Sequence, residues 1–223
     1  MEENSITLII PTYNHSETLE RAIKSVYYLD FNELIIVDDG SDENHKKIIN
    51  EIMKNYPNLI LLTHSSNQGL AETKNTGFNE STSKWAMTLD DDDYYIRNAI
   101  DNLKEFIIIH PEADIIHHKI KNYDPWNKET KEWGVETFTL EEIKENNRIT
   151  GTSLIKKDTW NKLNGFKNIP YEDWEFWIRA KEANFNFLFF PEIFYMRIYS
   201  GTGLECRTKK QITVKEWKEK YVK

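Results

Sequence analysis

The sequence predicts a single α/β domain with a mostly parallel central sheet, and three features of the chain support this prediction. Short apolar runs that suit buried strands begin near residues 6, 34, 59 and 85, and helical patterns lie between them. The period of about 25–28 residues fits right-handed strand–helix–strand crossovers between parallel strands. No segment has the composition of an interdomain linker, so residues 1–223 are expected to form one domain.

The first hundred residues carry the most regular pattern. Leu19, Ala22, Ile23 and Val26 recur at the spacing of a helix that buries one face. Pro11 is expected to end the first strand, because proline lacks the N–H that a sheet ladder uses. Strands are expected at residues 6–10, 34–37, 59–62 and 85–89, and helices at about 16–26, 46–54 and 70–78.

The later half is less regular. Residues 121–148 are polar and contain tryptophan, so they are expected to be irregular apart from one short helix. His117 and His118 with His110 do not suggest a joint metal site, because adjacent residues of a strand point to opposite faces. Helices are expected at about 97–109, 140–145, 158–163 and 172–183, and strands at 114–118, 152–155, 187–190 and 193–196.

Composition limits the classes of function. The net charge of −8 and the pI near 5.4 argue against non-specific binding of nucleic acid, which needs a basic surface. The single cysteine, Cys206, allows no internal disulfide and fits a reducing compartment. No secretory signal and no run of about 20 apolar residues is found. A soluble, cytoplasmic protein is expected, and the basic tail around Arg207 leaves contact with an anionic inner membrane face open.

Four consecutive aspartates, Asp90, Asp91, Asp92 and Asp93, follow the apolar run at residues 85–89. Adjacent carboxylates repel one another, more strongly as water is excluded, and a divalent cation would relieve that repulsion. Mg²⁺ and Mn²⁺ prefer oxygen ligands and use one or two carboxylates together with substrate phosphates. A solvated acidic turn at a helix start is the alternative reading of the same residues.

Three polar segments follow predicted parallel strands. They are residues 11–14, residues 38–41 and the acidic run at 90–93. Ligands of open α/β sheets bind beyond the carboxyl ends of the strands, so these segments are expected to converge on one site.

The motifs, taken together and in order, resemble the family 2 glycosyltransferases of the GT-A fold, over roughly residues 5–200. The motifs are Ile9–Asn14, Ile36–Ser41, Asn67–Ala71 with Lys74–Gly77, Leu89–Asp93, and the acidic segment Tyr171–Trp174 with Trp177 and Arg179. The resemblance implies that residues 1–100 bind a nucleotide sugar, that residues 101–200 bind the acceptor, and that residues 200–223 form a mobile loop and tail.

The resemblance also implies an activity: inverting transfer of a hexose or N-acetylhexosamine from a UDP-sugar to an acceptor hydroxyl, with Mn²⁺ or Mg²⁺. By the same resemblance, one group of residues binds the donor nucleotide. Pro11, Thr12 and Tyr13 would line its pocket, with Asp38 supporting the loop in which Asp39 accepts a hydrogen bond from uracil. Lys74 stands where the family often has arginine and would face the base or the phosphates.

The remaining roles implied by the resemblance belong to carboxylates. Asp92 would ligate the metal, Asp90 would hold the ribose or the metal indirectly, and Asp91 could take either role. Asp173 would be the catalytic base. Chemistry agrees with this division, since a metal stabilises the diphosphate leaving group while a separate carboxylate deprotonates the acceptor hydroxyl. Glu172 and Asp173 could instead simply complement a helix dipole.

One segment departs from the family pattern. Tyr199 occupies the nearest match to a histidine that completes the metal site in many members. Gly201 and Gly203 suggest a mobile lid, and Arg197 or Arg207 could reach the diphosphate from it.

The acceptor remains open between a polysaccharide, a lipid-linked glycan, a protein and a modified nucleic-acid base. Trp126 and Trp133 are candidates to stack on it. Two rival functions are a nucleotide-sugar-binding pseudoenzyme of the same fold and a nucleotidyltransferase. The second usually needs a glycine-rich phosphate loop, and residues 11–14 contain no glycine.

Overall fold

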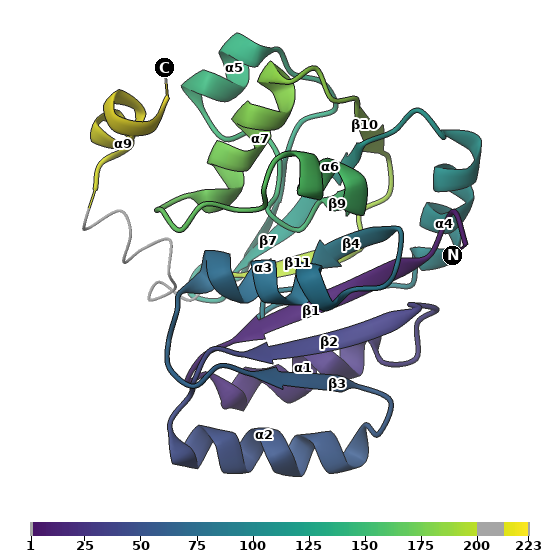
Figure 1. Ribbon diagram of the computed structural model, residues 1–223, viewed down its shortest axis with the longest axis vertical. Coiled ribbons are helices and arrows are strands. Elements are labelled where there is room, and N and C mark those ends of the chain that lie inside the picture. The colour runs from purple at the N-terminus through teal and green to yellow at the C-terminus, as the bar shows by residue number, and fades with distance from the viewer. Residues whose placement is uncertain (1, 200–211, 223) are drawn as a thin grey trace.

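The computed structural model describes residues 2–199 and 212–222. Its first half alternates strands and helices as predicted (Figure 1). In order, the elements are β1 (Ile6–Thr12), α1 (Ser16–Val26), β2 (Glu33–Asp38), α2 (Glu43–Asn55), β3 (Ile60–Thr63), α3 (Leu70–Glu80) and β4 (Trp85–Thr88).

The second half adds further short strands and helices. These are β5 (Tyr94–Tyr95), α4 (Ile100–Ile109), β6 (Ile115–His118), β7 (Ile120–Asp124), β8 (Glu129–Trp133), α5 (Leu140–Glu145), β9 (Leu154–Lys156), α6 (Lys157–Lys162), α7 (Glu172–Glu182), β10 (Phe187–Phe190), β11 (Tyr195–Ile198) and α9 (Val214–Tyr221). None of the helices described is both long and apolar enough to cross a bilayer.

A mostly parallel sheet forms the centre of the molecule. Within the described residues it has seven strands in the order β10-β6-β9-β4-β1-β2-β3. Neighbouring strands are parallel except at β9, which is antiparallel to both β4 and β6. The predicted α/β fold is therefore confirmed, and the carboxyl ends of β1, β2 and β4 lie along one edge, as the motif spacing required.

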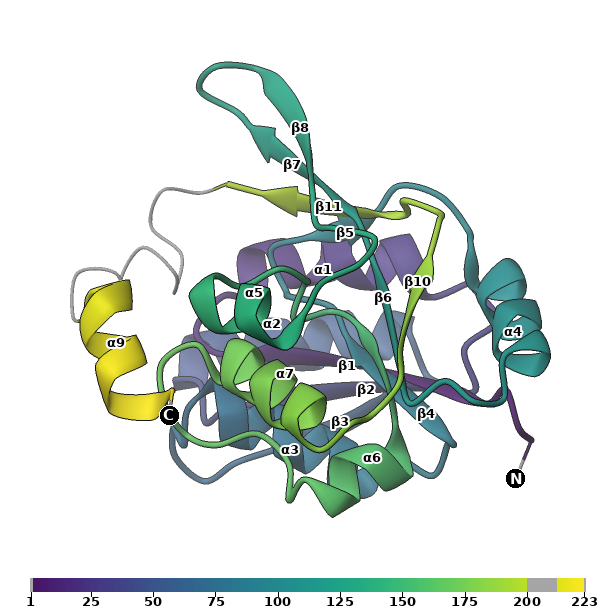
Figure 2. The ribbon, with the colours of Figure 1, turned by 90° about the horizontal axis from the view of Figure 1, so that it is seen from above.

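Helices cover both faces of this sheet (Figures 1 and 2). Because side chains of a strand alternate between faces, Leu8 and Ile10 of β1 pack with α1, α2 and α4, whereas Ile9 packs with α3, α6 and α7. Gly77 lets α3 approach closely, since a Cβ atom there would lie 2.4 Å from Cγ2 of Ile9. The two buried clusters fix the strand ends that carry the polar motifs.

Pro11 does not end the first strand, contrary to the prediction. It lies inside β1 and pairs with Val37 of β2. Ile9 O accepts from Leu89 N, so residues 9 and 11 direct their backbone groups toward β4. Because β4 has already ended at Thr88, no partner on that side needs the N–H that proline lacks.

Residues 121–148 are not irregular as expected, because β7 and β8 form an antiparallel hairpin there. It belongs to a second sheet, in the order β5-β11-β7-β8, and projects from the body of the molecule (Figure 2). All five residues of β8 are exposed, so the strand shows no apolar alternation from which it could be predicted. The short helix expected at 140–145 is present as α5.

Helix α9 packs beside α7, although the two helices are well separated in the sequence. A capping box of Thr213 and Glu216 begins it. Trp217 is completely buried and stacks on Trp174, with ring centroids 4.5 Å apart, and its Nε1 donates to Pro170 O at 2.6 Å. These contacts attach α9 to the residues that flank the acidic pair at the start of α7.

Candidate active site

The loop after β2 is built around Asp39. Its carboxylate accepts hydrogen bonds from Gln68 N at 2.8 Å and Gly69 N at 2.9 Å, and His64 Nδ1 lies 2.7 Å from Oδ1. Asp38 accepts from Ser41 N at 3.0 Å, which holds the turn. A carboxylate has about four acceptor sites, so Asp39 keeps capacity for a further donor such as a nucleobase N–H.

Two glycines allow this loop to meet the start of α3. Gly40 has φ +71°, and a Cβ atom there would lie 2.5 Å from the carbonyl carbon of Ser66. Gly69 has φ +95° and precedes the first residue of α3. Both positions favour glycine, which explains why the second and third motifs contain one.

The end of β1 presents an unsatisfied polar group and an exposed ring. Pro11 and Thr12 are buried, and Thr12 Oγ1 has no hydrogen-bond partner among the described residues. Such groups normally find a partner, and a bound ligand is one way to supply it. Tyr13 is 47% exposed, so its ring could stack on a planar base.

Each member of the acidic run has different surroundings. Asp93 accepts from the Tyr195 hydroxyl at 2.6 Å and from Ile198 N at 2.7 Å, so it joins the run to β11. Asp91 Oδ1 lies 2.9 Å from His15 Nδ1 at the start of α1. The Arg21 guanidinium donates to the backbone oxygen of Asp92. Contacts from α1 and β11 therefore fix the loop on both sides.

Burial and mutual repulsion make the ionised form of this run costly. Burial, with Asp90 and Asp91 nearby, raises the pKa of Asp92 to about 6. Burial, with Asp90 and Asp92 nearby, raises the pKa of Asp93 to about 8. Burial also raises the pKa of Asp90, although Lys74 and Arg197 oppose that shift. A bound cation would favour the ionised carboxylates, as the sequence led us to expect.

The residues present fit a hard divalent cation that is shared with a diphosphate. Among the described residues, no three His, Cys, Asp or Glu side chains are assembled around one point. The local donors are the carboxylate oxygens of residues 90–92, and Mg²⁺ or Mn²⁺ commonly takes one or two carboxylates and completes its shell with phosphate and water. The donor chemistry therefore suits a site that substrate completes.

Lys74 is a buried cation between the acidic run and α7. Its Nζ lies 2.8 Å from Glu172 Oε1, and the two side chains are only 5% and 10% exposed. Glu172, Asp90 and Asp173, all negatively charged, raise the pKa of Lys74 against the opposing effect of burial. One ammonium group thus interacts with carboxylates from both halves of the chain. The structure pairs Lys74 with an acid, a contact that the sequence did not reveal.

Asp173 lies at the same edge of the sheet as the acidic run. Asn147 Nδ2 donates to its Oδ2 at 3.3 Å, and a Cβ atom on Gly151 would lie 3.0 Å from the same oxygen. Gly151 O in turn accepts from Thr88 Oγ1 at the end of β4, two residues before Asp90. Burial and the neighbouring Glu172 raise the pKa of Asp173 to about 6, while Lys74 acts in the opposite direction.

The remaining predicted residues surround this edge or fall outside the described chain. Arg197 on β11 lies close enough to Asp90 to oppose the rise that burial causes in its pKa. Tyr199 contacts Trp126, with ring centroids 5.8 Å apart. Arg207 and the glycines proposed for a lid lie outside the described residues.

Sequence reasoning missed three supporting side chains. His15 contacts Asp91, His64 contacts Asp39, and Glu172 pairs with Lys74. Each pair joins residues far apart in the chain, so only the fold brings them together. The one available signal was the position of His15 directly after the first motif.

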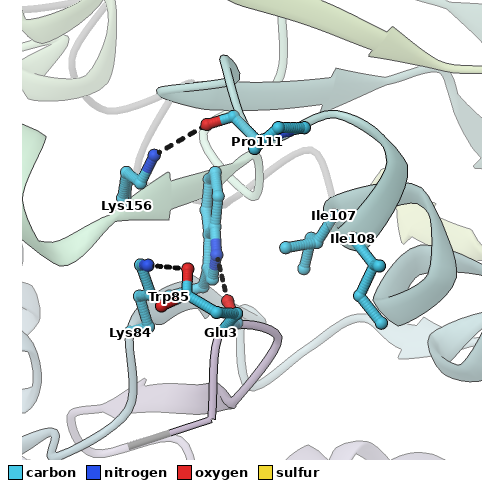
Figure 3. Close-up of a pocket in the computed structure, with 7 residues that line it drawn as sticks. All are labelled: Glu3, Lys84, Trp85, Ile107, Ile108, Pro111 and Lys156. Carbon is cyan, nitrogen blue, oxygen red and sulfur yellow. Dashed lines mark hydrogen bonds and ion pairs between the residues drawn. The ribbon is translucent and has the colours of Figure 1, made fainter.

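A shallow cavity of about 130 Å³ lies elsewhere, at the start of β4 (Figure 3). There Lys84 pairs with Glu3, and Lys156 donates to Pro111 O at 3.3 Å. Trp85 begins β4, whereas the acidic run follows its other end. This cavity is therefore separate from the convergent motifs.

Comparisons with known proteins agree with the geometry. A family model described as Glycosyl transferase family 2 matches residues 7–184. An uncharacterized glycosyltransferase of Haemophilus influenzae is 26% identical over 183 residues, covering 78% of this chain and 61% of that protein. The minor teichoic acid biosynthesis protein GgaA of Bacillus subtilis is 30% identical over 173 residues, covering 74% of this chain and 35% of GgaA. The chain thus spans about three fifths or less of these relatives.

Solved structures share the fold. The Staphylococcus aureus protein TarS, residues 1–349 in complex with UDP-GlcNAc, matches with a TM-score of 0.72 and 20% identity, covering 91% of this chain and 60% of that one. Mannosyltransferase PcManGT from Pyrobaculum calidifontis, in complex with GDP-Man and Mn²⁺, matches with a TM-score of 0.65 and 15% identity, covering 89% and 57%. These matches confirm the expected GT-A architecture.

The family match contains every motif that the fold brings to this edge, from the end of β1 to the acidic pair of α7. It covers well over half of the chain. The protein belongs to glycosyl transferase family 2.

Proposed function

We propose that this protein transfers a sugar from a UDP-sugar to an acceptor hydroxyl with inversion at the anomeric carbon. The observation that carries the proposal is the position of Asp173, which lies beside Gly151, a residue that accepts from Thr88 at the end of β4, two residues before Asp90. A carboxylate at that place could deprotonate the acceptor, while the carboxylates of residues 90–92 could bind the donor through a cation. Family membership and the TarS complex with UDP-GlcNAc support the same class of reaction.

Donor binding would use the polar ends of β1 and β2. Asp39, held by two backbone amides, would accept the N3–H of uracil through its remaining lone pair. Thr12 Oγ1 would gain a partner, and Tyr13 would stack on the base. Arg197 and Lys74 would place positive charge beside the diphosphate.

The residues of the acidic run would hold the cation, with Asp92 as ligand and Asp90 or Asp91 in support. When bound, Mn²⁺ or Mg²⁺ would supply Lewis-acid stabilisation of the negative charge that develops on the diphosphate. The complex of PcManGT with Mn²⁺ supports a divalent cation in this fold.

Asp173 would act as general base in a single displacement. It would take the acceptor hydroxyl proton as the new carbon–oxygen bond forms and as the bond from the anomeric carbon to the diphosphate oxygen breaks. The electron pair of that bond would leave with UDP. Attack opposite the leaving group inverts the centre, so no covalent enzyme intermediate is needed.

The Asp173→Asn variant tests this assignment, with Asp158→Asn as a matched control from the first turn of α6. We expect Asp173→Asn to lose at least a hundredfold in transfer while UDP binding with Mn²⁺ changes less than twofold. The control is expected to retain both. Wild-type rates in Asp173→Asn would overturn the base assignment.

A thermal-shift panel tests the donor. UDP-glucose, UDP-galactose, UDP-GlcNAc and GDP-mannose would be compared with and without Mn²⁺, because a bound donor raises apparent stability by mass action. We expect stabilisation by UDP-sugars that increases with Mn²⁺. Binding without any sugar release would instead indicate a nucleotide-sugar-binding protein that is not a transferase.

A further inference from the structure

An exposed pair of aromatic rings lies next to the candidate active site. Trp126, at the tip of the β7–β8 hairpin, is 62% exposed, and Tyr199, directly after β11, is 47% exposed. Their ring centroids are 5.8 Å apart and their planes meet at 76°. The two rings come from separate segments, so the fold creates the pair.

Hydrogen bonds hold the backbone of both residues in place. Tyr199 N donates to Tyr123 O at 2.9 Å, which continues the pairing of β11 with β7. Trp126 N donates to Asp124 Oδ1 at 2.9 Å, and Asn127 Nδ2 donates to Asp124 Oδ2 at 2.7 Å. Asp124 therefore fixes the turn that carries Trp126.

The strand β11 connects this pair to the site proposed for the donor. Ile198 N, on this strand, donates to Asp93 Oδ1 of the acidic run at 2.7 Å. Alternate residues along a strand share a face, so Tyr199 continues the face of Arg197 about 7 Å farther along. The aromatic pair thus lies where a molecule larger than one sugar would extend from the reacting centre.

A buried polar atom on the same sheet lacks a partner. Asn122 is the register partner of Arg197 on β7, and its Oδ1 has no hydrogen-bond donor among the described residues. Buried amide oxygens are normally satisfied, and a ligand hydroxyl is one group that could do so. This is a second feature, independent of the rings, that points to a polar ligand at this sheet.

The surroundings of the pair favour a sugar ring as its occupant. An aromatic face can pack against the C–H face of a pyranose while the sugar hydroxyls stay hydrated. The whole of β8 beside it is exposed and polar or charged except for Trp133, so the apolar area is limited to about two rings. A stable protein interface needs about 800 Å² from each partner, which two rings do not provide.

We propose that Trp126 and Tyr199 form a binding site for a pyranose ring of the acceptor, which is therefore a saccharide. The proposal rests on the proposed function, because Asp173 is taken to receive the proton of a hydroxyl on that saccharide. The hairpin would hold one ring while a hydroxyl on the saccharide reaches the reacting centre.

The test compares Trp126→Ala and Tyr199→Ala with Trp133→Ala. The sequence offered Trp133 as a second stacking candidate, but it pairs with Ile120 at the opposite end of the same hairpin from Trp126. It is 36% exposed and therefore serves as a matched control. The probes are the methyl β-pyranosides of glucose, galactose and N-acetylglucosamine, with glycerol as an alcohol that has no ring. Binding is measured by saturation-transfer NMR, and KM and donor hydrolysis by UDP release.

We expect at least one pyranoside to bind the wild type and the Trp133→Ala variant, and binding to weaken about tenfold in Trp126→Ala and Tyr199→Ala. Hydrolysis of the donor by water should stay within twofold in Trp126→Ala, because that ring lies at the tip of the hairpin and has no role in the proposed donor or metal site. Failure of every pyranoside to bind the wild type, or equal binding by all variants, would overturn the proposal. The NMR measurement needs no turnover, so a wild type that binds pyranosides but releases no UDP would refute the proposed function alone.

Discussion

Replacing Lys74 by methionine should be among the most damaging single substitutions in the molecule. Its ammonium group lies 2.8 Å from Glu172, its side chain is only 5% exposed, and its charge also acts on Asp90 and Asp173. Lys74→Met keeps most of the side-chain volume but leaves three buried carboxylates without their shared cation. Breaking a buried ion pair by removing one partner costs about 3–5 kcal/mol.

That cost is large enough to measure directly. For a chain of this size, 1 kcal/mol shifts Tm by about 2–4 °C, so the Tm of Lys74→Met should fall by about 6–20 °C. Urea unfolding followed by tryptophan fluorescence gives the free energy independently. Lys24→Met is the control, because Lys24 pairs with Glu20 on the exposed face of α1 and should unfold like the wild type.

A second variant tests whether Lys74 interacts with more than one carboxylate. Glu172→Gln removes one carboxylate but leaves Lys74 near Asp90 and Asp173, so it should destabilise the protein less than Lys74→Met. If Glu172→Gln proved the more damaging change, or if Lys74→Met unfolded like the Lys24 control, the shared-cation interpretation would be refuted.

Three further outcomes are expected. At saturating Mn²⁺, kcat/KM for transfer should fall about tenfold per pH unit below pH 6, because Asp173 has a raised pKa of about 6 and only its ionised form accepts a proton; a flat profile from pH 5 to 8 would contradict this. Gly77→Ala should lower the free energy of unfolding by about 1–3 kcal/mol in urea, because its methyl group would overlap Ile9, and unchanged stability would show that α3 can move away. Trp217→Ala should cost about 3–5 kcal/mol in the same assay through the cavity it leaves beside Trp174, whereas a loss below 1 kcal/mol would mean that α9 is weakly attached.

The sequence was most informative where local pattern and tertiary structure coincide. The apolar runs at β1, β2 and β4 are buried in the structure, and the polar segments after them meet at one edge because parallel strands share a direction. That inference needed only periodicity and topology rules.

Prediction failed where long-range contacts decide the structure. β8 is exposed along its length, so its strand conformation is set by pairing with β7 and not by burial. Pro11 could be placed inside β1 only by knowing that β4 stops short of it. The contacts of His15, His64 and Glu172 likewise depend on partners in other elements.

The docking of α9 has a practical consequence for recombinant work. The family match stops at residue 184, which invites a shortened fragment for expression. Such a fragment would lack Trp217, which stacks on Trp174, and would therefore expose an aromatic surface one residue from Asp173. We would therefore expect it to aggregate, and homology boundaries should not guide where this gene is cut.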